Sequence, residues 1–124
     1  MGGRKAKRAE VLRTAKIIRK VAGARPRYFR FPGGCHTRAD IRLVASLAEQ
    51  SVQWDVISGD SFISDPAKVE HEVLRHVQPG SIIVMHLIGP GAHAGDRPAV
   101  KALIPKLHAR GYHFVRLRKL LRRP

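Results

Sequence analysis

Apolar side chains recur every three or four positions in four stretches of the chain, which is the spacing of an amphipathic helix. Two of these stretches carry start signals. Thr37 with Asp40 is a capping-box variant, and Asp65 followed by Pro66 is an N-cap with a proline in the first turn. We therefore predict helices over residues 10–22, 37–48, 66–77 and 98–109.

Short runs of apolar, β-branched and aromatic residues alternate with these helices and predict strands. The expected strands cover residues 28–31, 52–57, 81–86 and 112–117. The run at 81–86 is almost entirely apolar, which is typical of a strand buried on both faces of a parallel sheet. Alternating helices and strands indicate an α/β fold of parallel β/α units, and four such units are about half of an eight-stranded barrel.

Polar and glycine-rich segments follow three of the predicted strands. They are Arg30 with Pro32–Gly34, the segment Asp55–Asp60, and the segment His86–Gly95. In parallel β/α folds, functional groups gather at the carboxyl ends of the strands. We therefore predict one site that combines an arginine, one or two aspartates and a histidine.

Basic residues are concentrated at the two ends of the chain. Of the 124 residues, positions 1–30 carry a formal net charge of +10, positions 31–109 carry −1, and positions 110–124 carry +6. Such ends can attract polyanions, but the neutral middle needs another explanation. The single cysteine, Cys35, excludes an internal disulfide framework and a zinc module built on several cysteines.

No targeting or membrane segment is expected. No apolar run approaches the roughly 20 residues that cross a bilayer. The first residues are basic, but charged residues interrupt every apolar stretch that follows them, so we expect no secretory signal and a cytoplasmic location for the chain as it stands.

Three motifs together carry a family resemblance: Arg30–Gly34, Trp54–Asp60 and Ile82–His86. In order and spacing they resemble the last three sequence motifs of the polysaccharide deacetylase family, the NodB-homology domain. The resemblance extends over roughly residues 10–121, with basic tails at 1–9 and 122–124. It implies the C-terminal half of a distorted β/α barrel that is incomplete at its N-terminal side.

The resemblance also implies an activity, the metal-dependent removal of acetyl groups from an N-acetylated oligo- or polysaccharide. The metal is usually zinc, and the bond that is hydrolysed is a non-peptide carbon–nitrogen bond. His86 matches the family's general acid, Asp60 the carboxylate that orients it, and Arg30 the arginine that contacts the catalytic carboxylate. The further candidates, for substrate binding, are Pro32, Gly33, Gly34, Trp54 and Asp55.

The sequence departs from the family in two motifs. The Thr-Phe-Asp-Asp motif that supplies the base and one metal ligand, and the His-x-x-x-His pair that supplies the other ligands, do not occur among these residues. Phe31, Ile57 and Ser61 also stand where the family usually has proline, an acid and tryptophan. We therefore expect no metal ligands and no cofactor in this chain itself. We expect a fragment that is inactive alone: either a truncated or split product, which a complementing N-terminal half would complete, or a decayed relative of the family.

Two other classes of protein stay open. A basic nucleic-acid-binding protein would explain the charged ends, but no recognised nucleic-acid motif occurs and the neutral β/α series argues against it. A non-catalytic carbohydrate-binding or partner-completed half domain would use aromatic side chains such as Trp54 to stack on sugars. His86 also has a structural interpretation as a core histidine, and Asp55 and Asp60 have one as turn-forming acids.

Overall fold

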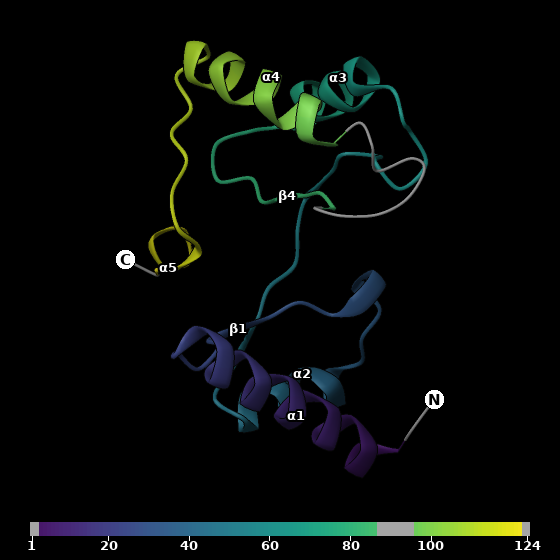
Figure 1. Cartoon of the computed structure of the whole chain (residues 1–124), viewed down its shortest axis with the longest axis vertical. Helices are drawn as coiled ribbons and strands as arrows, with labels where there is room; N and C mark the ends of the chain where they lie inside the picture. Colours follow the sequence, from purple (N-terminus) through teal and green to yellow (C-terminus); the bar gives the residue numbers. More distant parts are fainter. Residues whose placement is uncertain (1–2, 87–95, 123–124) are drawn as a thin grey trace. The chain divides into compact units, whose positions relative to one another are not determined.

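The computed structural model describes residues 3–86 and 96–122. The chain divides into two compact units, residues 1–53 and 54–124 (Figure 1). The glycine-rich loop expected at 89–95 lies outside the described residues.

The first unit packs two helices beside a pair of parallel strands. Its elements are helix α1 (Arg4–Ala22), strand β1 (Tyr28–Phe29), the 3-10 turn η1 (Pro32–Gly34), helix α2 (Arg38–Ser46) and strand β2 (Gln50–Ser51). In the parallel pair, Tyr28 lies opposite Gln50 and Phe29 opposite Ser51. Helices α1 and α2 contact each other and bury Val11, Ala15, Leu43, Val44 and Leu47.

The helices of this unit begin as local chemistry dictates. The predicted capping box of α2 is confirmed: the Asp40 N–H donates to Thr37 Oγ1 (3.2 Å), and the Thr37 N–H donates to Asp40 Oδ2 (3.0 Å). Helix α1 begins at Arg4 and not at residue 10, because the segment before Glu10 consists of alanine and long straight-chain side chains that favour helix without needing burial.

The second unit has the same plan. Its elements are strand β3 (Val56–Ile57), helix α3 (Pro66–His76), strand β4 (Ile83–Val84), helix α4 (Asp96–Ala109) and the short helix α5 (Leu117–Leu120). Strands β3 and β4 are parallel, with Val56 opposite Ile83 and Ile57 opposite Val84. The predicted N-cap of α3 is confirmed, because the Asp65 side chain accepts from the Ala67 N–H (2.9 Å).

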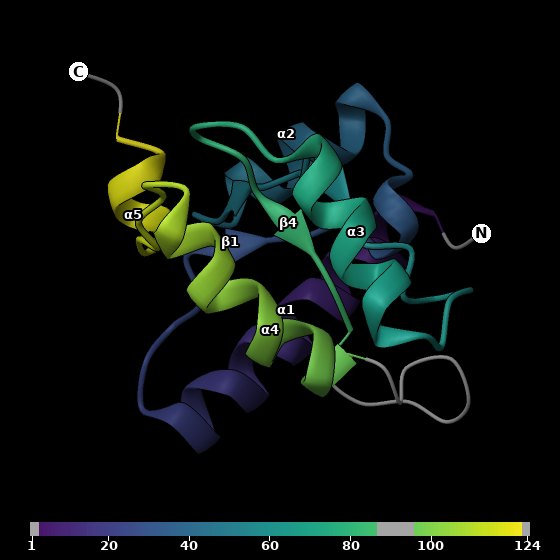
Figure 2. The same ribbon diagram turned by 90° about the horizontal axis from the view of Figure 1, so that it is seen from above.

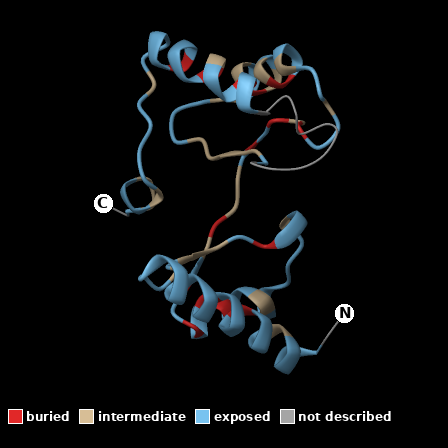
Figure 3. Cartoon of the chain, viewed as in Figure 1, coloured by how far each residue is buried: buried red, intermediate tan, exposed pale blue. Residues whose placement is uncertain are grey.

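Helices α3 and α4 lie side by side against the β3–β4 pair, as the two views in Figures 1 and 2 show. Their facing sides meet the strand in one apolar cluster formed by Val56, Val73, Leu103 and Leu107. Figure 3 marks the buried positions of each unit. Many of the described residues are exposed, and even Ile57 within β3 is 64% exposed. The expectation that residues 81–86 form a strand buried on both faces is therefore wrong, since Ile83 and Val84 are only half-buried.

Two predicted strands do not form as expected. Only the last two residues of the strand predicted over 52–57 form a strand, β3 (Val56–Ile57), which pairs with β4; the other strand of this region, β2, lies just before the predicted span and pairs with β1. The predicted strand over 112–117 pairs with no other described segment. Segments that form strands and segments that do not can have the same apolar composition. Whether a segment becomes a strand depends on another segment, distant in the sequence, that pairs with it.

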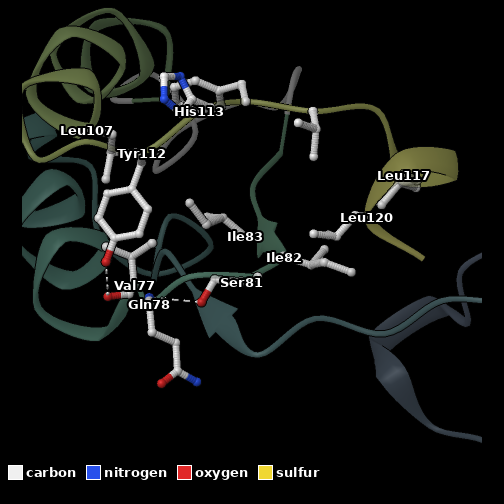
Figure 4. A pocket seen from close by; sticks show the side chains of 13 residues that line it. Val77, Gln78, Ser81, Ile82, Ile83, Leu107, Tyr112, His113, Leu117 and Leu120 are labelled. Atoms are coloured by element: carbon white, nitrogen blue, oxygen red, sulfur yellow. Dashed lines mark hydrogen bonds between the residues drawn. The ribbon is translucent and has the colours of Figure 1, made fainter. Parts of the chain in front are cut away.

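The segment 112–117 instead lines an apolar cavity of about 290 Å³ in the second unit (Figure 4). Residues from the amino-terminal side of β4 form another part of its wall, among them Ile82 and Ile83. The Tyr112 hydroxyl donates to the Val77 carbonyl (3.2 Å), which ties this segment to the end of α3. The Tyr112 N–H also donates to the Leu107 carbonyl (3.0 Å), so two hydrogen bonds hold the start of the segment without ladder pairing, while residues 113–116 are exposed.

The coarse fold prediction, an α/β chain of parallel β/α units, is confirmed by both strand pairs. Within the described part of the chain, no helix combines the length and apolar content that crossing a membrane requires.

Candidate functional site

Asp60 and His86 meet just beyond the carboxyl ends of β3 and β4. Because Ile57 lies opposite Val84 in a parallel pair, the segments that follow the two strands leave the sheet side by side. The backbone N–H of His86 donates to Asp60 Oδ2 (2.6 Å), and the His86 ring atom Nδ1 lies 3.0 Å from the same oxygen. The Asp60 residue is 3% exposed, whereas the His86 side chain is 45% exposed. A buried carboxylate therefore holds one side of an accessible imidazole.

A tight turn brings Asp60 into this place. Gly59 has φ of +76°, a conformation that other residues adopt only with strain, and its carbonyl accepts the N–H groups of Phe62 (2.9 Å) and Ile63 (3.0 Å). The turn folds the Asp60 carboxylate back on the residue two positions earlier, so that the hydroxyl of the fully buried Ser58 donates to Asp60 Oδ1 (2.8 Å).

These contacts determine the ionisation of Asp60. Burial raises the pKa of the carboxyl, but the His86 N–H, the Ser58 hydroxyl and the His86 ring together lower it by more, and the net pKa of Asp60 lies below its ordinary value. The carboxylate is therefore ionised at neutral pH despite its burial, and it can accept a hydrogen bond from a donor such as an imidazole N–H.

The pair is suited to acid–base chemistry and not to a serine nucleophile. Ser61 Oγ lies 3.4 Å from His86 Nδ1, the same ring atom that faces Asp60. In a Ser-His-Asp triad the aspartate and the serine contact opposite nitrogens of the ring. With Nδ1 held by Asp60, proton transfer to a substrate would use Nε2.

Arg30 and the Pro32–Gly34 turn belong to the first unit. Arg30 directly follows β1 and is exposed, so it stands at the carboxyl end of its strand as predicted. Gly33 has φ of +61°, and the Gly34 carbonyl accepts from the Gln53 side-chain amide (3.2 Å). These contacts give the turn a definite shape. Its role in a substrate groove stays a prediction, as does the role of Arg30.

Asp55 and Trp54 lie at the other end of the second strand pair, before β3 begins. Asp55 accepts from the Ser81 hydroxyl (2.6 Å) and from the Ile82 N–H (2.6 Å), and both bonds lower its pKa. This carboxylate thus joins the amino ends of β3 and β4, whereas Asp60 and His86 lie beyond their carboxyl ends. Substrate binding by Asp55 and Trp54 stays a prediction.

Ser58 is the residue of this site that sequence reasoning missed. In the segment Ser58-Gly59-Asp60 the serine resembles ordinary turn chemistry. The useful sign is that it continues the buried face of β3, two positions after Val56, and therefore points inward.

The residues described do not fit a metal centre. In the part of the chain that the structure describes, no three histidine, cysteine, aspartate or glutamate side chains converge as a metal ion requires. The one close acid–histidine pair of the site supplies two such groups and no third.

The known proteins that the chain resembles include deacetylases and an esterase. No family model matches the chain. It is 30% identical over 111 residues to the peptidoglycan-N-acetylglucosamine deacetylase of Bacillus cereus, a match that covers 89% of this chain and 40% of that protein.

Solved structures of similar proteins also include a peptidoglycan deacetylase. The chain matches the crystal structure of the peptidoglycan N-acetylglucosamine deacetylase Bc1960 with a TM-score of 0.90 and 26% identity, over 96% of this chain and 56% of that one. It matches a family 4 acetyl xylan esterase from Clostridium thermocellum, determined in complex with a cobalt ion, with a TM-score of 0.85 and 28% identity, over 95% and 56% of the two chains. The chain thus spans 40% of the curated relative's length and just over half of these two solved chains.

Proposed function

We propose that the chain is one part of a domain of the polysaccharide deacetylase family and that it carries the general-acid side of a carbohydrate N-deacetylase. The substrate class is an N-acetylated oligo- or polysaccharide, and the reaction is hydrolysis of a non-peptide carbon–nitrogen bond. The observation that carries the proposal is the contact between the buried, ionised Asp60 and the exposed His86.

Each residue has a stated part in this chemistry. His86 protonates the leaving amine, and Asp60 holds the imidazole through Nδ1 so that Nε2 delivers the proton. Arg30 contributes positive charge beside the catalytic carboxylate of the complete domain. The turn Pro32–Gly34 shapes the groove for the sugar, and Trp54 and Asp55 are further contacts for it.

In this proposal, the metal ligands and the catalytic base belong to a segment outside these residues. A relative of the chain is described with a cobalt ion, and a metal would activate the attacking water. The described residues do not provide the ligands for such an ion. We infer that a segment with the Thr-Phe-Asp-Asp and His-x-x-x-His motifs supplies them, and that residues 10–121 are the C-terminal half of the resulting distorted β/α barrel. Alone, the chain is an inactive fragment.

Acetate release from N-acetylglucosamine oligomers in the presence of zinc tests the proposal. We expect none from the chain alone, and release from a chimera in which a segment with both missing motifs is joined to it. In the chimera, His86→Ala should lower kcat by about 10²–10⁴-fold, the usual contribution of a general acid. The matched control is His108→Ala, an exposed histidine of α4.

Two results would contradict the proposal. Acetate release by the chain alone that His86→Ala abolishes would show that the fragment is active. A folded chimera whose activity is unchanged by His86→Ala would rule out the general-acid role.

The deacetylase and esterase relatives do not favour the alternative of a nucleic-acid-binding protein.

A further inference from the structure

We propose that Ser58 is a positioning residue, which holds the Asp60 carboxylate so that one oxygen is reserved for His86. The catalytic meaning of this proposal rests on the proposed function. The hydrogen-bond arrangement itself does not, and it can be tested without any activity.

The two oxygens of the Asp60 carboxylate have separate partners. Oδ1 accepts from the Ser58 hydroxyl (2.8 Å), and Oδ2 accepts from the His86 backbone N–H (2.6 Å) and faces the His86 ring atom Nδ1 (3.0 Å). The torsion that turns an aspartate carboxylate about its Cβ–Cγ bond has broad minima, so the side chain does not hold one orientation by itself. A donor on each oxygen fixes it.

Ser58 is placed for this task by the strand and the turn. The residue is fully buried, and its backbone N–H donates to the Val84 carbonyl (3.4 Å), which continues the β3–β4 ladder. The turn at Gly59 then brings Asp60 back over the Ser58 side chain. The hydroxyl has a single proton, and it is donated to Asp60 Oδ1.

A space-filling role alone would not require a hydroxyl. A fully buried position that directly follows a strand is more often apolar, and an alanine would leave little empty volume. A buried hydroxyl must also have a partner, and this one has the carboxylate. The distinguishing property is electrostatic: the Ser58 hydroxyl stabilises the ionised form of Asp60, and its removal raises the pKa of that carboxyl.

The experiment is a carbon-detected NMR titration of the Asp60 carboxyl in the full chain. We expect Ser58→Ala to raise the pKa of Asp60 by about one unit, the size that loss of a hydrogen bond to a charged group produces. Ser58→Thr, which keeps the hydroxyl, should restore the value. Ser61→Ala is the matched control, because the Ser61 hydroxyl lies near the His86 ring, whereas among the described residues the donors to the Asp60 carboxylate are on Ser58 and His86; it should leave the pKa of Asp60 unchanged.

Each outcome decides the proposal. A folded Ser58→Ala chain with the wild-type Asp60 pKa overturns it, and so does an equal rise in Ser61→Ala. If alanine prevents folding, Ser58→Cys keeps the volume with a weaker donor, and a rise in the Asp60 pKa supports the proposal while an unchanged value overturns it. His86 is the other titrating group that contacts Asp60, so its ring signals are followed in the same spectra.

The same variants separate this inference from the proposed function. If the Asp60 pKa responds to Ser58 while the chimera with the missing motifs releases no acetate, the positioning role stands and the deacetylase function falls. If the chimera is active, Ser58→Ala should lower kcat with little change in KM, because the substrate does not contact Ser58.

Discussion

At the scale of single residues, the candidate site depends on one turn. The sequence motifs placed Asp60 and His86 together, and the structure has them in contact at 3.0 Å. Their catalytic roles stay predictions. The sequence did not indicate how Asp60 is held, because the segment Ser58–Asp60 has the composition of any polar turn. Its hydrogen bonds arise only when Ser58 continues a buried strand face and Gly59 takes a positive φ.

Gly59→Ala should therefore destabilise the second unit and disturb the Asp60–His86 contact. The positive φ alone costs a non-glycine residue about 1–3 kcal/mol. A Cβ at this position would also lie 2.8 Å from Ile63 Cδ1, which must move. We expect a loss of about 2–3 kcal/mol in the free energy of unfolding, measured by urea denaturation at neutral pH.

Gly80→Ala is the control for this prediction. Gly80 has φ of +89°, and a Cβ added there would have no neighbouring atom within 4 Å, so the variant should show the conformational cost without the clash. Ile63→Val removes Cδ1, and in combination with Gly59→Ala it should recover part of the loss. Equal costs at Gly59 and Gly80 would refute the steric explanation.

At the scale of elements, helices were easier to predict than strands. The caps at Thr37 and Asp65 are local chemistry, and the structure contains both. Strand pairing is not local. The segment 52–57 and the segment 112–117 have similar apolar composition, yet the first contributes only Val56 and Ile57 to a sheet and the second lines a cavity. Which segment becomes a strand depends on the partner that reaches it, and this partner is not encoded in its own residues.

The contribution of Asp40, in the cap of α2, to the stability of the fold should depend on pH. The Lys7 ammonium at 2.7 Å and the Thr37 backbone and hydroxyl groups lower the pKa of Asp40 from 3.8 to about 2. A carboxyl whose pKa is lower in the folded state stabilises that state above its ordinary pKa, and the contribution is lost as the pH falls through the folded value. The contribution of Asp40 is therefore present at neutral pH and declines between pH 3.8 and about 2.

Urea denaturation of the wild type and of Asp40→Asn, repeated across this pH range, measures the effect. We expect the wild type to be the more stable at neutral pH and the difference to shrink towards pH 2. Glu10→Gln is the control, because Glu10 forms an exposed ion pair with Arg13 on α1 and its loss should cost little stability. A difference between wild type and Asp40→Asn that is constant with pH would contradict the assignment.

At the scale of the whole chain, the relation to known proteins explains more than the charge does. The formal charge of +15 suggests a polyanion partner, but it is concentrated at the two ends. The chain spans about half of the solved deacetylase-type structures that it matches. Each sheet has only two strands among the described residues, and Ile57 is largely exposed within a strand, as the proposed half barrel would require.

Metal binding tests this interpretation for the chain as a unit. Cobalt(II) in a protein site gives visible absorption bands, and the Clostridium thermocellum esterase, determined in complex with a cobalt ion, is the positive control. Because no three ligand side chains converge within the described residues, we expect the chain to show no saturable bands at micromolar cobalt. The chimera with the missing motifs should show them, and His86→Ala in the chimera should leave them unchanged, since His86 is proposed as the acid and not as a ligand. Saturable bands from the chain alone would mean that it holds a metal centre of its own, and the division of labour between the two halves would then be wrong.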